Sequence, residues 1–230
     1  MPVLPATWYP GTRAPWNGTP STTSYIIRRT VRAGRDQMRA NILAWLPDDM
    51  RGRRLLDAGC GTGALAVEAA KRGADVTAID LSPALVELAR DRSNEALRAA
   101  NLGSKAGRID FHVGDMLDPA LGHFHHVVAM DSLIHYTHAD VTAMLAQLSG
   151  RTSETIVFTF APRTPALTMM HALGRFFPRQ DRAPAIEPVD VGALRRHLAA
   201  EPALSAWEAQ RTSRIDSGFY ISQALELAAR

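Results

Sequence analysis

Residues 53–63, RRLLDAGCGTG, set a short apolar run directly before a turn that contains three glycines. The segment 53–57 is typical of a short buried strand, and the glycines that follow break it. Glycine permits a sharp turn and lets a ligand lie directly against the backbone. Residues 64–72 fit a helix that Gly73 ends. The stretch therefore predicts a strand–turn–helix unit whose turn binds a ligand.

Strand-like and helix-like segments alternate on both sides of this unit. Further strands are expected at 76–80, 109–113, 124–131, 154–160, near 203–210 and at 216–222. Helices are expected at 34–46, 82–102, 139–149, 165–177 and 188–200. Such alternation predicts an α/β fold with a mostly parallel sheet and helices on both faces. Ligands of these sheets bind beyond the C-terminal ends of the strands.

Acidic residues stand at the ends of three successive strands. Asp57 precedes the glycine turn, Asp80 ends the second strand, and Asp115 follows the third. The spacing of residues 59–64 also fits a dinucleotide fingerprint, but Asp57 would repel a pyrophosphate. A carboxylate there attracts the ammonium and sulfonium groups of S-adenosylmethionine (SAM), and one at Asp80 can accept ribose hydrogen bonds. The three acids therefore favour SAM.

The segments LLDAGCGTG, VTAIDLS and GDM resemble the class I SAM-dependent methyltransferases over roughly residues 34–160. The resemblance implies a Rossmann-like, seven-stranded sheet with an antiparallel C-terminal hairpin, which residues 203–222 can supply. It implies that the glycine turn holds the methionyl end of SAM and that the fourth strand ends near the sulfonium. The expected cofactor-binding residues are Asp57, Gly59, Cys60, Gly61, Gly63, Asp80, Leu81, Asp115, Met116, Met130 and Asp131.

Four other segments carry a narrower resemblance. Residues 30–49, 112–136, 154–179 and 218–227 are similar to the magnesium-protoporphyrin IX O-methyltransferases, and the match spans about residues 26–228. That family transfers the SAM methyl group to one propionate of Mg-protoporphyrin IX, early in chlorophyll or bacteriochlorophyll synthesis. The resemblance implies a catalytic role for His135. It also implies that the magnesium belongs to the substrate, with no metal bound by the protein.

This acceptor would combine two carboxylates with a flat apolar ring. A propionic acid group has a pKa of about 4.3 in water, so at neutral pH it is already ionised and needs little general base. A second propionate calls for a cation, and arginine suits a bidentate clamp. The apolar segment 165–178 could form a wall or a lid. The expected acceptor residues are Tyr136, Arg163, Met169, Met170, Arg32, Arg35 and Tyr25.

The front of the chain differs from the rest. Residues 1–24 hold five of the 14 prolines and predict a flexible arm before a methyltransferase domain at 25–230, in which 161–200 form a lid or acceptor insertion. Some family members place a tyrosine in this arm as a partner of the histidine, but residues 16–23 contain none. Residues 1–56 carry nine arginines against three aspartates. This balance indicates an anionic partner, substrate or membrane surface, or simply a solvated helix face.

Composition narrows the remaining classes. The chain has 230 residues, 46% of them hydrophobic and 21% charged, and one cysteine, which is typical of a globular domain in a reducing cytoplasm. It has no apolar run long enough for a membrane span and no signal-peptide pattern at its start. No nucleic-acid module is recognisable. The expected partner is Mg-protoporphyrin IX, and the magnesium chelatase and the surface of photosynthetic membranes are further candidates.

Three other functions stay open at the level of sequence. The first is SAM-dependent methylation of a phenol or amine on another small molecule. The second is an NAD(P)-dependent reductase that uses the glycine turn, and the third is a non-catalytic SAM-binding protein.

Overall fold

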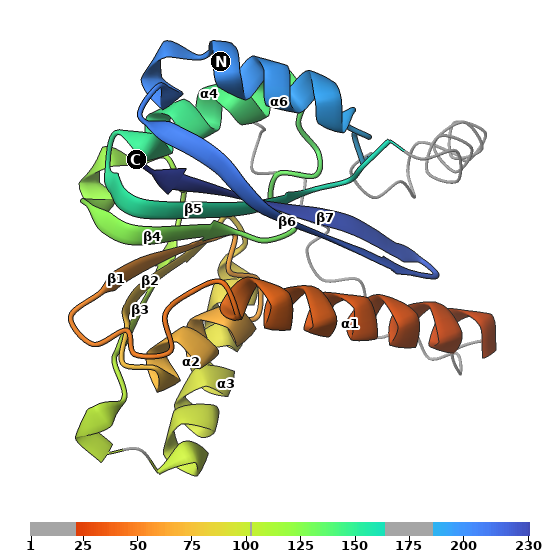
Figure 1. Ribbon diagram of the computed structural model, residues 1–230. Helices are drawn as coiled ribbons and strands as arrows, with labels where there is room; N and C mark the ends of the chain where they lie inside the picture. The colour runs from red at the N-terminus through yellow and green to blue at the C-terminus, as the bar shows by residue number, and fades with distance from the viewer. Residues whose placement is uncertain (1–21, 102, 164–185) are drawn as a thin grey trace.

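A seven-stranded sheet forms the centre of the computed structural model, which describes residues 22–101, 103–163 and 186–230 (Figure 1). The strand order is β3-β2-β1-β4-β5-β7-β6. The strands are β1 (Arg54–Ala58), β2 (Asp75–Asp80), β3 (Ile109–Val113), β4 (Phe124–Ala129), β5 (Thr152–Phe160), β6 (Trp207–Ser217) and β7 (Tyr220–Ala229). Strands β1 to β5 run parallel, and β7 is antiparallel to both β5 and β6. The predicted mixed sheet with an antiparallel C-terminal hairpin is confirmed.

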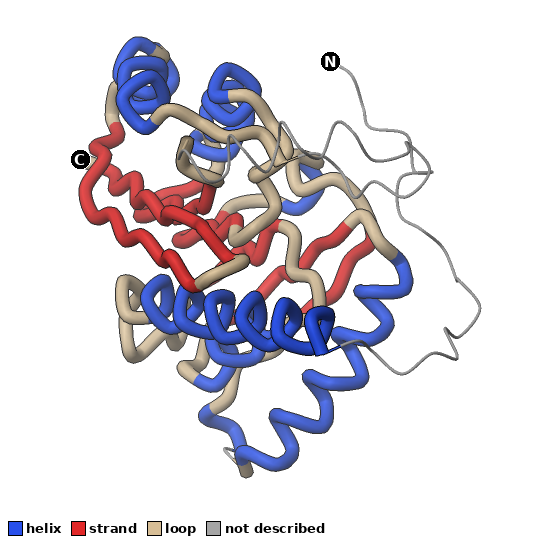
Figure 2. Tube along the Cα trace, turned by 90° about the vertical axis from the view of Figure 1, so that its right-hand side faces the viewer, coloured by secondary structure: helices blue, strands red, loops and turns tan. Residues whose placement is uncertain are grey.

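Helices cover both faces of this sheet (Figures 1 and 2). One face carries α1 (Thr22–Leu43), α2 (Ala64–Lys71) and α3 (Pro83–Ala100), and the other carries α4 (His138–Ser149) and α6 (Val191–Ala200). Successive residues of a strand point to opposite faces, so Leu55 packs with Met38 and Ile42 of α1, whereas Leu56 packs with Leu145 of α4. Each face therefore has its own apolar core. In the part of the chain that the structure describes, no helix is long and apolar enough to cross a membrane.

Helix α1 begins at Thr22, twelve residues before the expected start at residue 34, and ends at Leu43 rather than 46. Its buried stripe runs through Val31, Gly34, Met38 and Ile42. Gly34 interrupts the repeat of apolar residues in the sequence, but the helix continues through it. The ring of Tyr220 fills the space that a larger side chain would occupy. A Cβ at Gly34 would lie 2.5 Å from Tyr220 Cδ1. The pattern alone therefore shows only the second half of α1.

The C-terminal hairpin also lies later than expected. A short 3₁₀ turn at Pro202–Leu204 occupies the start of the first expected strand, and the second expected strand, 216–222, spans the actual turn at Gly218 and Phe219. Strand β6 forms an exposed edge and has mainly polar side chains, whereas β7 lies between β5 and β6 and is largely buried. Weak alternation in an edge strand explains the misplaced boundaries.

The helix expected at 188–200 begins at Val191, where the Asp190 side chain accepts a hydrogen bond from Ala193 N at 2.7 Å. The helix expected after Ser82 begins at Pro83, with Ser82 as its N-cap. The helix expected at 165–177 and the arm up to residue 21 lie outside the described residues.

Candidate active site

The glycine turn after β1 is tied to the neighbouring strand β2. The backbone amides of Gly59 and Cys60 both donate to Ile79 O at 2.9 Å. Gly59 has φ +84°, and a Cβ there would lie 2.4 Å from Ser132 Cβ. Only glycine combines that left-handed backbone with so close a neighbour. The turn is therefore a fixed backbone cradle at the C-terminal edge of the sheet.

Asp57 lies beneath this turn with its carboxylate incompletely paired. The residue is 2% exposed, and its Oδ2 atom has no hydrogen-bond partner. Burial raises the pKa of Asp57 to about 7, the charge of Asp80 adds to the shift, and Arg39 opposes it. An orphaned acceptor in a buried position is costly unless a ligand pairs with it. A cationic ligand such as the ammonium group of SAM fits this atom.

The next two acids lie at the ends of neighbouring strands. The Asp80 carboxylate accepts hydrogen bonds from Gly61 N and Ser82 N, both at 2.9 Å, and still has acceptor capacity for ribose hydroxyls. Asp115 accepts from Leu117 N at 2.9 Å through one oxygen, and the Arg151 side chain donates to the Met116 carbonyl. Between the two acids, Leu81 is half exposed at the end of β2. These features fit the ribose and adenine of SAM.

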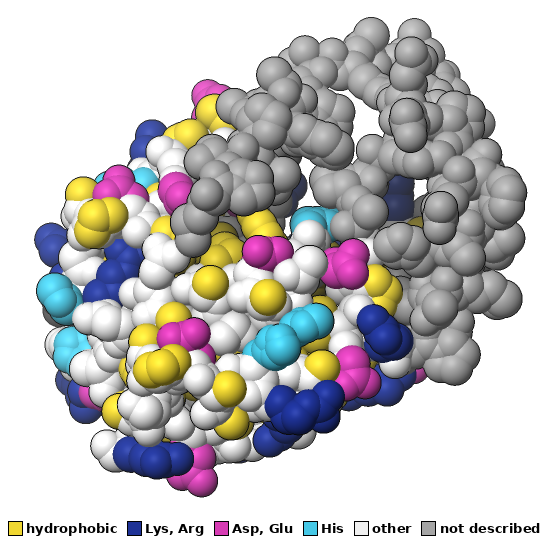
Figure 3. Space-filling model, turned by 90° about the horizontal axis from the view of Figure 1, so that it is seen from above, with side chains coloured by type: hydrophobic (Ala, Val, Ile, Leu, Met, Phe, Trp, Pro, Cys, Tyr) yellow, Lys and Arg dark blue, Asp and Glu magenta, His cyan; other side chains and the backbone are white. Residues whose placement is uncertain are grey.

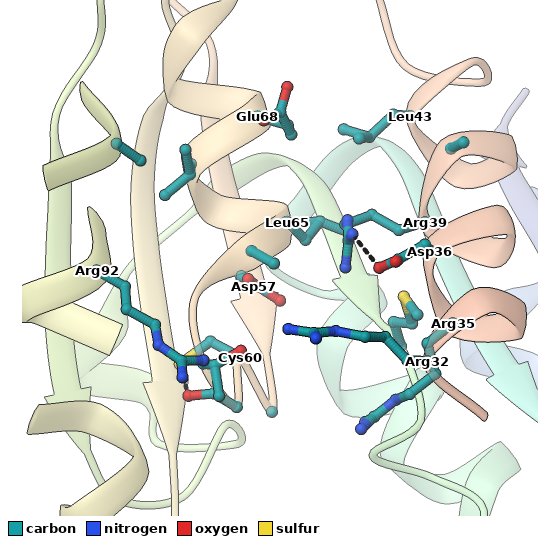
Figure 4. Close-up of a pocket in the computed structure, with 18 of the residues that line it drawn as sticks. Arg32, Arg35, Asp36, Arg39, Leu43, Asp57, Cys60, Leu65, Glu68 and Arg92 are labelled. Atoms are coloured by element: carbon teal, nitrogen blue, oxygen red, sulfur yellow. Dashed lines mark hydrogen bonds and ion pairs between the residues drawn. The ribbon is translucent and has the colours of Figure 1, made fainter. Parts of the chain in front are cut away.

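A cavity of about 1380 Å³ opens between α1 and the glycine turn (Figure 4). Its floor includes Asp57, the glycine turn and Met130. Its opposite wall is α1, from which arginine side chains project toward the turn (Figure 4). They lie on one helical stripe because their spacing is three or four residues. The stripe consists of Arg28, Arg32, Arg35 and Arg39.

This concentration of positive charge belongs to the α1 side of the molecule. On the face seen from above α4 and α6, acidic, basic and apolar side chains are interspersed on the visible surface (Figure 3). Five of the nine arginines in residues 1–56 thus line this cavity from α1, and four of these five are also exposed to solvent.

The loop after β4 carries the residues expected to meet the acceptor. His135 is exposed, and Tyr136 is partly buried against the core, which raises the pKa of its hydroxyl. Glu187 N donates to Ile134 O at 2.9 Å, and Arg163 N donates to Val189 O at 2.9 Å. Glu187 thus lies beside Ile134, the residue that precedes His135.

Comparison with known proteins identifies the group to which this geometry belongs. A family model described as magnesium-protoporphyrin IX methyltransferase C-terminus matches residues 129–229, and a methyltransferase-domain model matches residues 55–153. The magnesium-protoporphyrin O-methyltransferase of Rhodobacter capsulatus is 48% identical over 200 residues, which cover 87% of this chain and 83% of that protein. The chain belongs to the magnesium-protoporphyrin O-methyltransferase family.

The chain also resembles a sequence and a crystal structure from Synechocystis. A magnesium-protoporphyrin O-methyltransferase of strain PCC 6803 is 28% identical over 203 residues, 87% of this chain and 84% of that protein. The crystal structure of magnesium protoporphyrin IX methyltransferase from the same strain, with bound S-adenosylhomocysteine, has 25% identity and a TM-score of 0.74. The match covers 93% of this chain and 90% of that one.

The methyltransferase fold brings together only part of the predicted site. Asp57, Gly59, Cys60, Gly61 and Met130 line the same cavity as Arg32 and Arg35. Several other predicted residues do not belong to its lining in the described part of the chain. They are Gly63, Asp80, Leu81, Asp115, Met116, Asp131, His135, Tyr136 and Arg163. Met169 and Met170 lie outside the described residues, and so does the side chain of Tyr25, which belongs to α1. Their roles stay predictions.

Two predicted residues have surroundings that define their chemistry. Cys60 is 8% exposed, and burial raises the pKa of its thiol, so the sulfur is a close-packed neutral group of the turn. The Asp131 carboxylate is engaged by Arg35 and Tyr220. In the described residues, no group of three or more metal-binding side chains is present.

Tyr220 is the site residue that the sequence reasoning missed. It follows a hairpin turn, and the nearby Asp216 and Gly218 do not form a motif that would mark it. The one available signal was its place in the segment 218–227, which carries the resemblance to the family.

Proposed function

We propose that this chain transfers the methyl group of SAM to a propionate carboxylate of Mg-protoporphyrin IX, giving the monomethyl ester. One observation carries the proposal: a single cavity has on its floor the buried carboxylate of Asp57, with one oxygen unpaired, and along the opposite wall five arginines of α1. The carboxylate suits a cationic methyl donor, and the arginines suit an anionic acceptor. Ligands of opposite charge would then be held side by side.

The cavity is larger than the usual site of one small ligand. Such sites enclose about 300–1,000 Å³, and the cavity between α1 and the turn measures about 1380 Å³. It has room for part of the acceptor beside the methionyl end of SAM, while Asp80, Asp115 and His135 lie outside its lining.

The chemistry requires positioning more than proton transfer. SAM supplies an electrophilic methyl group on a cationic sulfur. Asp57 would hold the methionyl ammonium, Asp80 the ribose, and the arginine wall the carboxylates of the acceptor. Because a propionate is ionised at neutral pH, His135 would orient the carboxylate or remove a residual proton. Orientation of this kind can supply roughly 7–11 kcal/mol of a bimolecular barrier.

The test is a reconstituted reaction. Purified protein is incubated with SAM and Mg-protoporphyrin IX, and the porphyrins are separated by chromatography. We expect the monomethyl ester to accumulate with time and with protein concentration. Binding of S-adenosylhomocysteine, measured by calorimetry on the same preparation, shows that the protein is competent. Absence of the ester from a preparation that binds this ligand would overturn the proposal.

The proposed function also bears on the predicted acceptor segment, the N-terminal arm and the partners. We propose that residues 161–200 contribute to the acceptor side, because Glu187 in this segment donates to the carbonyl of Ile134, the residue before His135. Residues 1–24 as an arm, contact with the magnesium chelatase and association with a membrane surface stay predictions. The reductase alternative loses its basis, because the chain belongs to a methyltransferase family and Asp57 would repel a pyrophosphate.

A further inference from the structure

Asp131, directly after β4, is held in one orientation from several sides. Its backbone has φ +57°, a conformation that costs a non-glycine residue free energy unless its surroundings impose it. Its amide donates to Thr159 Oγ1 at 2.7 Å, and Tyr220 Oη lies 3.0 Å and 3.2 Å from its two carboxylate oxygens. Burial and the neighbouring Asp131 charge both raise the pKa of Tyr220, so its hydroxyl stays protonated and donates.

Tyr220 itself has little freedom to move. It is 8% exposed at the start of β7, and its ring and Cβ lie against Gly34 in the middle of α1. The hairpin, the end of β4 and α1 therefore meet at this tyrosine. Because Tyr220 is fixed in β7 and packs against α1, its hydroxyl is a rigid donor to Asp131 after β4.

The Asp131 carboxylate also accepts hydrogen bonds from the Thr159 hydroxyl at 3.3 Å and from an arginine of the α1 wall. Arg35 Nε donates to Asp131 Oδ2 at 2.9 Å. The Arg35 side chain is 54% exposed and lines the cavity beside Met130, whereas the Asp131 side chain is 7% exposed. Among the described residues only Nε is engaged, so toward them the two terminal nitrogens of the guanidinium keep their donors for a ligand. A guanidinium held by Nε can present these donors as a fork to a carboxylate.

We propose that Arg35 is the residue that binds a carboxylate of the acceptor, and that Asp131 and Tyr220 are positioning residues that fix its guanidinium. This inference rests on the proposed function and names its anion subsite. The other arginines of the stripe lack such support. Arg39 pairs with Asp36 on the same helix, and in the described part of the chain neither Arg28 nor Arg32 forms an ion pair.

The first experiment compares two porphyrins that differ only in charge. Binding of Mg-protoporphyrin IX and of its dimethyl ester is titrated by absorbance and by fluorescence quenching. In the unmodified protein the diacid should bind more tightly than the diester. Arg35→Gln should lower this ratio about tenfold, the effect of losing a charge-assisted bidentate contact. Arg35→Lys should recover only part of it, because an ammonium lacks the fork.

The matched control is Arg214→Gln, which also removes a half-exposed arginine paired with an acidic residue, Asp216, but lies on the edge strand β6. It should leave the ratio unchanged. A ratio that Arg35→Gln does not change, or that Arg214→Gln lowers equally, would overturn the proposal.

The second experiment tests positioning. Tyr220→Phe removes one hydroxyl and keeps the ring against Gly34. It should raise KM for Mg-protoporphyrin about three- to tenfold and leave affinity for S-adenosylhomocysteine within twofold, because only the support of Arg35 is weakened. Asp131→Asn should raise KM for Mg-protoporphyrin further, because it removes the charge that pairs with Arg35. In the double variant Arg35→Gln, Tyr220→Phe, the tyrosine should have no further effect on KM. Additive effects would overturn the positioning role.

These outcomes are separable from failure of the proposed function. If the unmodified protein forms no ester although it binds S-adenosylhomocysteine, the proposed function fails. If it forms the ester and Arg35→Gln keeps the preference for the diacid, the function stands and the subsite is wrong.

Discussion

Asp57 connects the fold to the ligand at the scale of a single residue. Its pKa is raised from 3.8 to about 7, so in the ligand-free protein the carboxyl is mostly protonated below pH 7. A ligand cation favours the ionised form, and binding therefore releases a proton. Affinity for SAM should fall as pH drops from 7.5 to 5.5, by up to about tenfold per unit below the pKa. Calorimetry across this range measures it.

Asp57→Asn provides the control for this dependence. It should bind SAM more weakly at pH 7.5 and with little change down to pH 5.5. If the affinity for SAM fell equally with pH in both proteins, the proton released on binding would come from a group other than Asp57.

The same shift has a consequence for stability. A carboxyl whose folded pKa is raised destabilises the fold increasingly as pH rises from about 4 to 7, after which the penalty is constant. Its upper limit is about 4 kcal/mol for a shift of roughly three units. Without ligand, Asp57→Asn should therefore raise Tm at pH 8 and leave it nearly unchanged at pH 4. Thermal unfolding at both pH values measures this, and a lower Tm at pH 8 would contradict it.

His135 distinguishes between classes of acceptor. A phenol or amine needs a real base, and general-base catalysis typically contributes about 10²–10⁴-fold. An ionised propionate needs less, so His135→Ala should lower kcat by about ten- to a hundredfold at every pH between 6 and 8. Steady-state rates with Mg-protoporphyrin measure the loss. Complete loss with ligand binding intact would contradict the positioning role.

At the scale of elements, the position of α1 depends on one glycine. Alanine at residue 34 gains about 1 kcal/mol of helix propensity. It also places a methyl group 2.5–2.8 Å from the ring and Cβ of Tyr220, and such overpacking typically costs about 1–3 kcal/mol. Tyr220 cannot easily yield, because its hydroxyl is bonded to Asp131. Gly34→Ala should therefore destabilise the protein and raise KM for the porphyrin.

Denaturant unfolding and steady-state kinetics measure both effects. The matched control is Gly150→Ala, where a Cβ would meet only Gln147 O at 3.7 Å and φ is −65°. It should change neither quantity much. A Gly34→Ala protein as stable and as active as the control would show that α1 is not held by this contact.

The elements also show where prediction from sequence succeeds. The N-cap of α3 and the strands that end at or before Asp57, Asp80 and Asp115 are marked by local pattern, and the mostly parallel sheet follows from the alternation of strands with helices. Gly34 interrupts the apolar pattern, so the first half of α1 cannot be predicted from it. The edge strand β6 has no clear alternation of apolar and polar residues. The contact of Asp131 with Arg35 spans 96 residues and that with Tyr220 spans 89. No local pattern encodes such pairs, so this part of the site required the fold.

Across the whole molecule, the net charge of +3 is unevenly distributed, with several arginines of α1 at one cavity. The arginine stripe concentrates positive charge in one cavity, where it should attract a dianionic porphyrin over several ångströms. Raising the salt concentration from about 20 to 200 mM shortens the Debye length from roughly 20 to 7 Å. We therefore expect kcat/KM for Mg-protoporphyrin to fall several-fold, with affinity for S-adenosylhomocysteine nearly constant in the same buffers. A rate that rises with salt would contradict this attraction.

The most direct measurement of the central claim follows the methyl group itself. Mg-protoporphyrin IX is incubated with purified protein and SAM that carries a trideuterated methyl group, and the product is analysed by mass spectrometry before and after mild alkaline hydrolysis. The proposed reaction predicts one labelled methyl group per porphyrin, removed completely by alkali because it is a carboxyl ester. A label that survives alkali, or a porphyrin that acquires none while the protein binds S-adenosylhomocysteine, would contradict it.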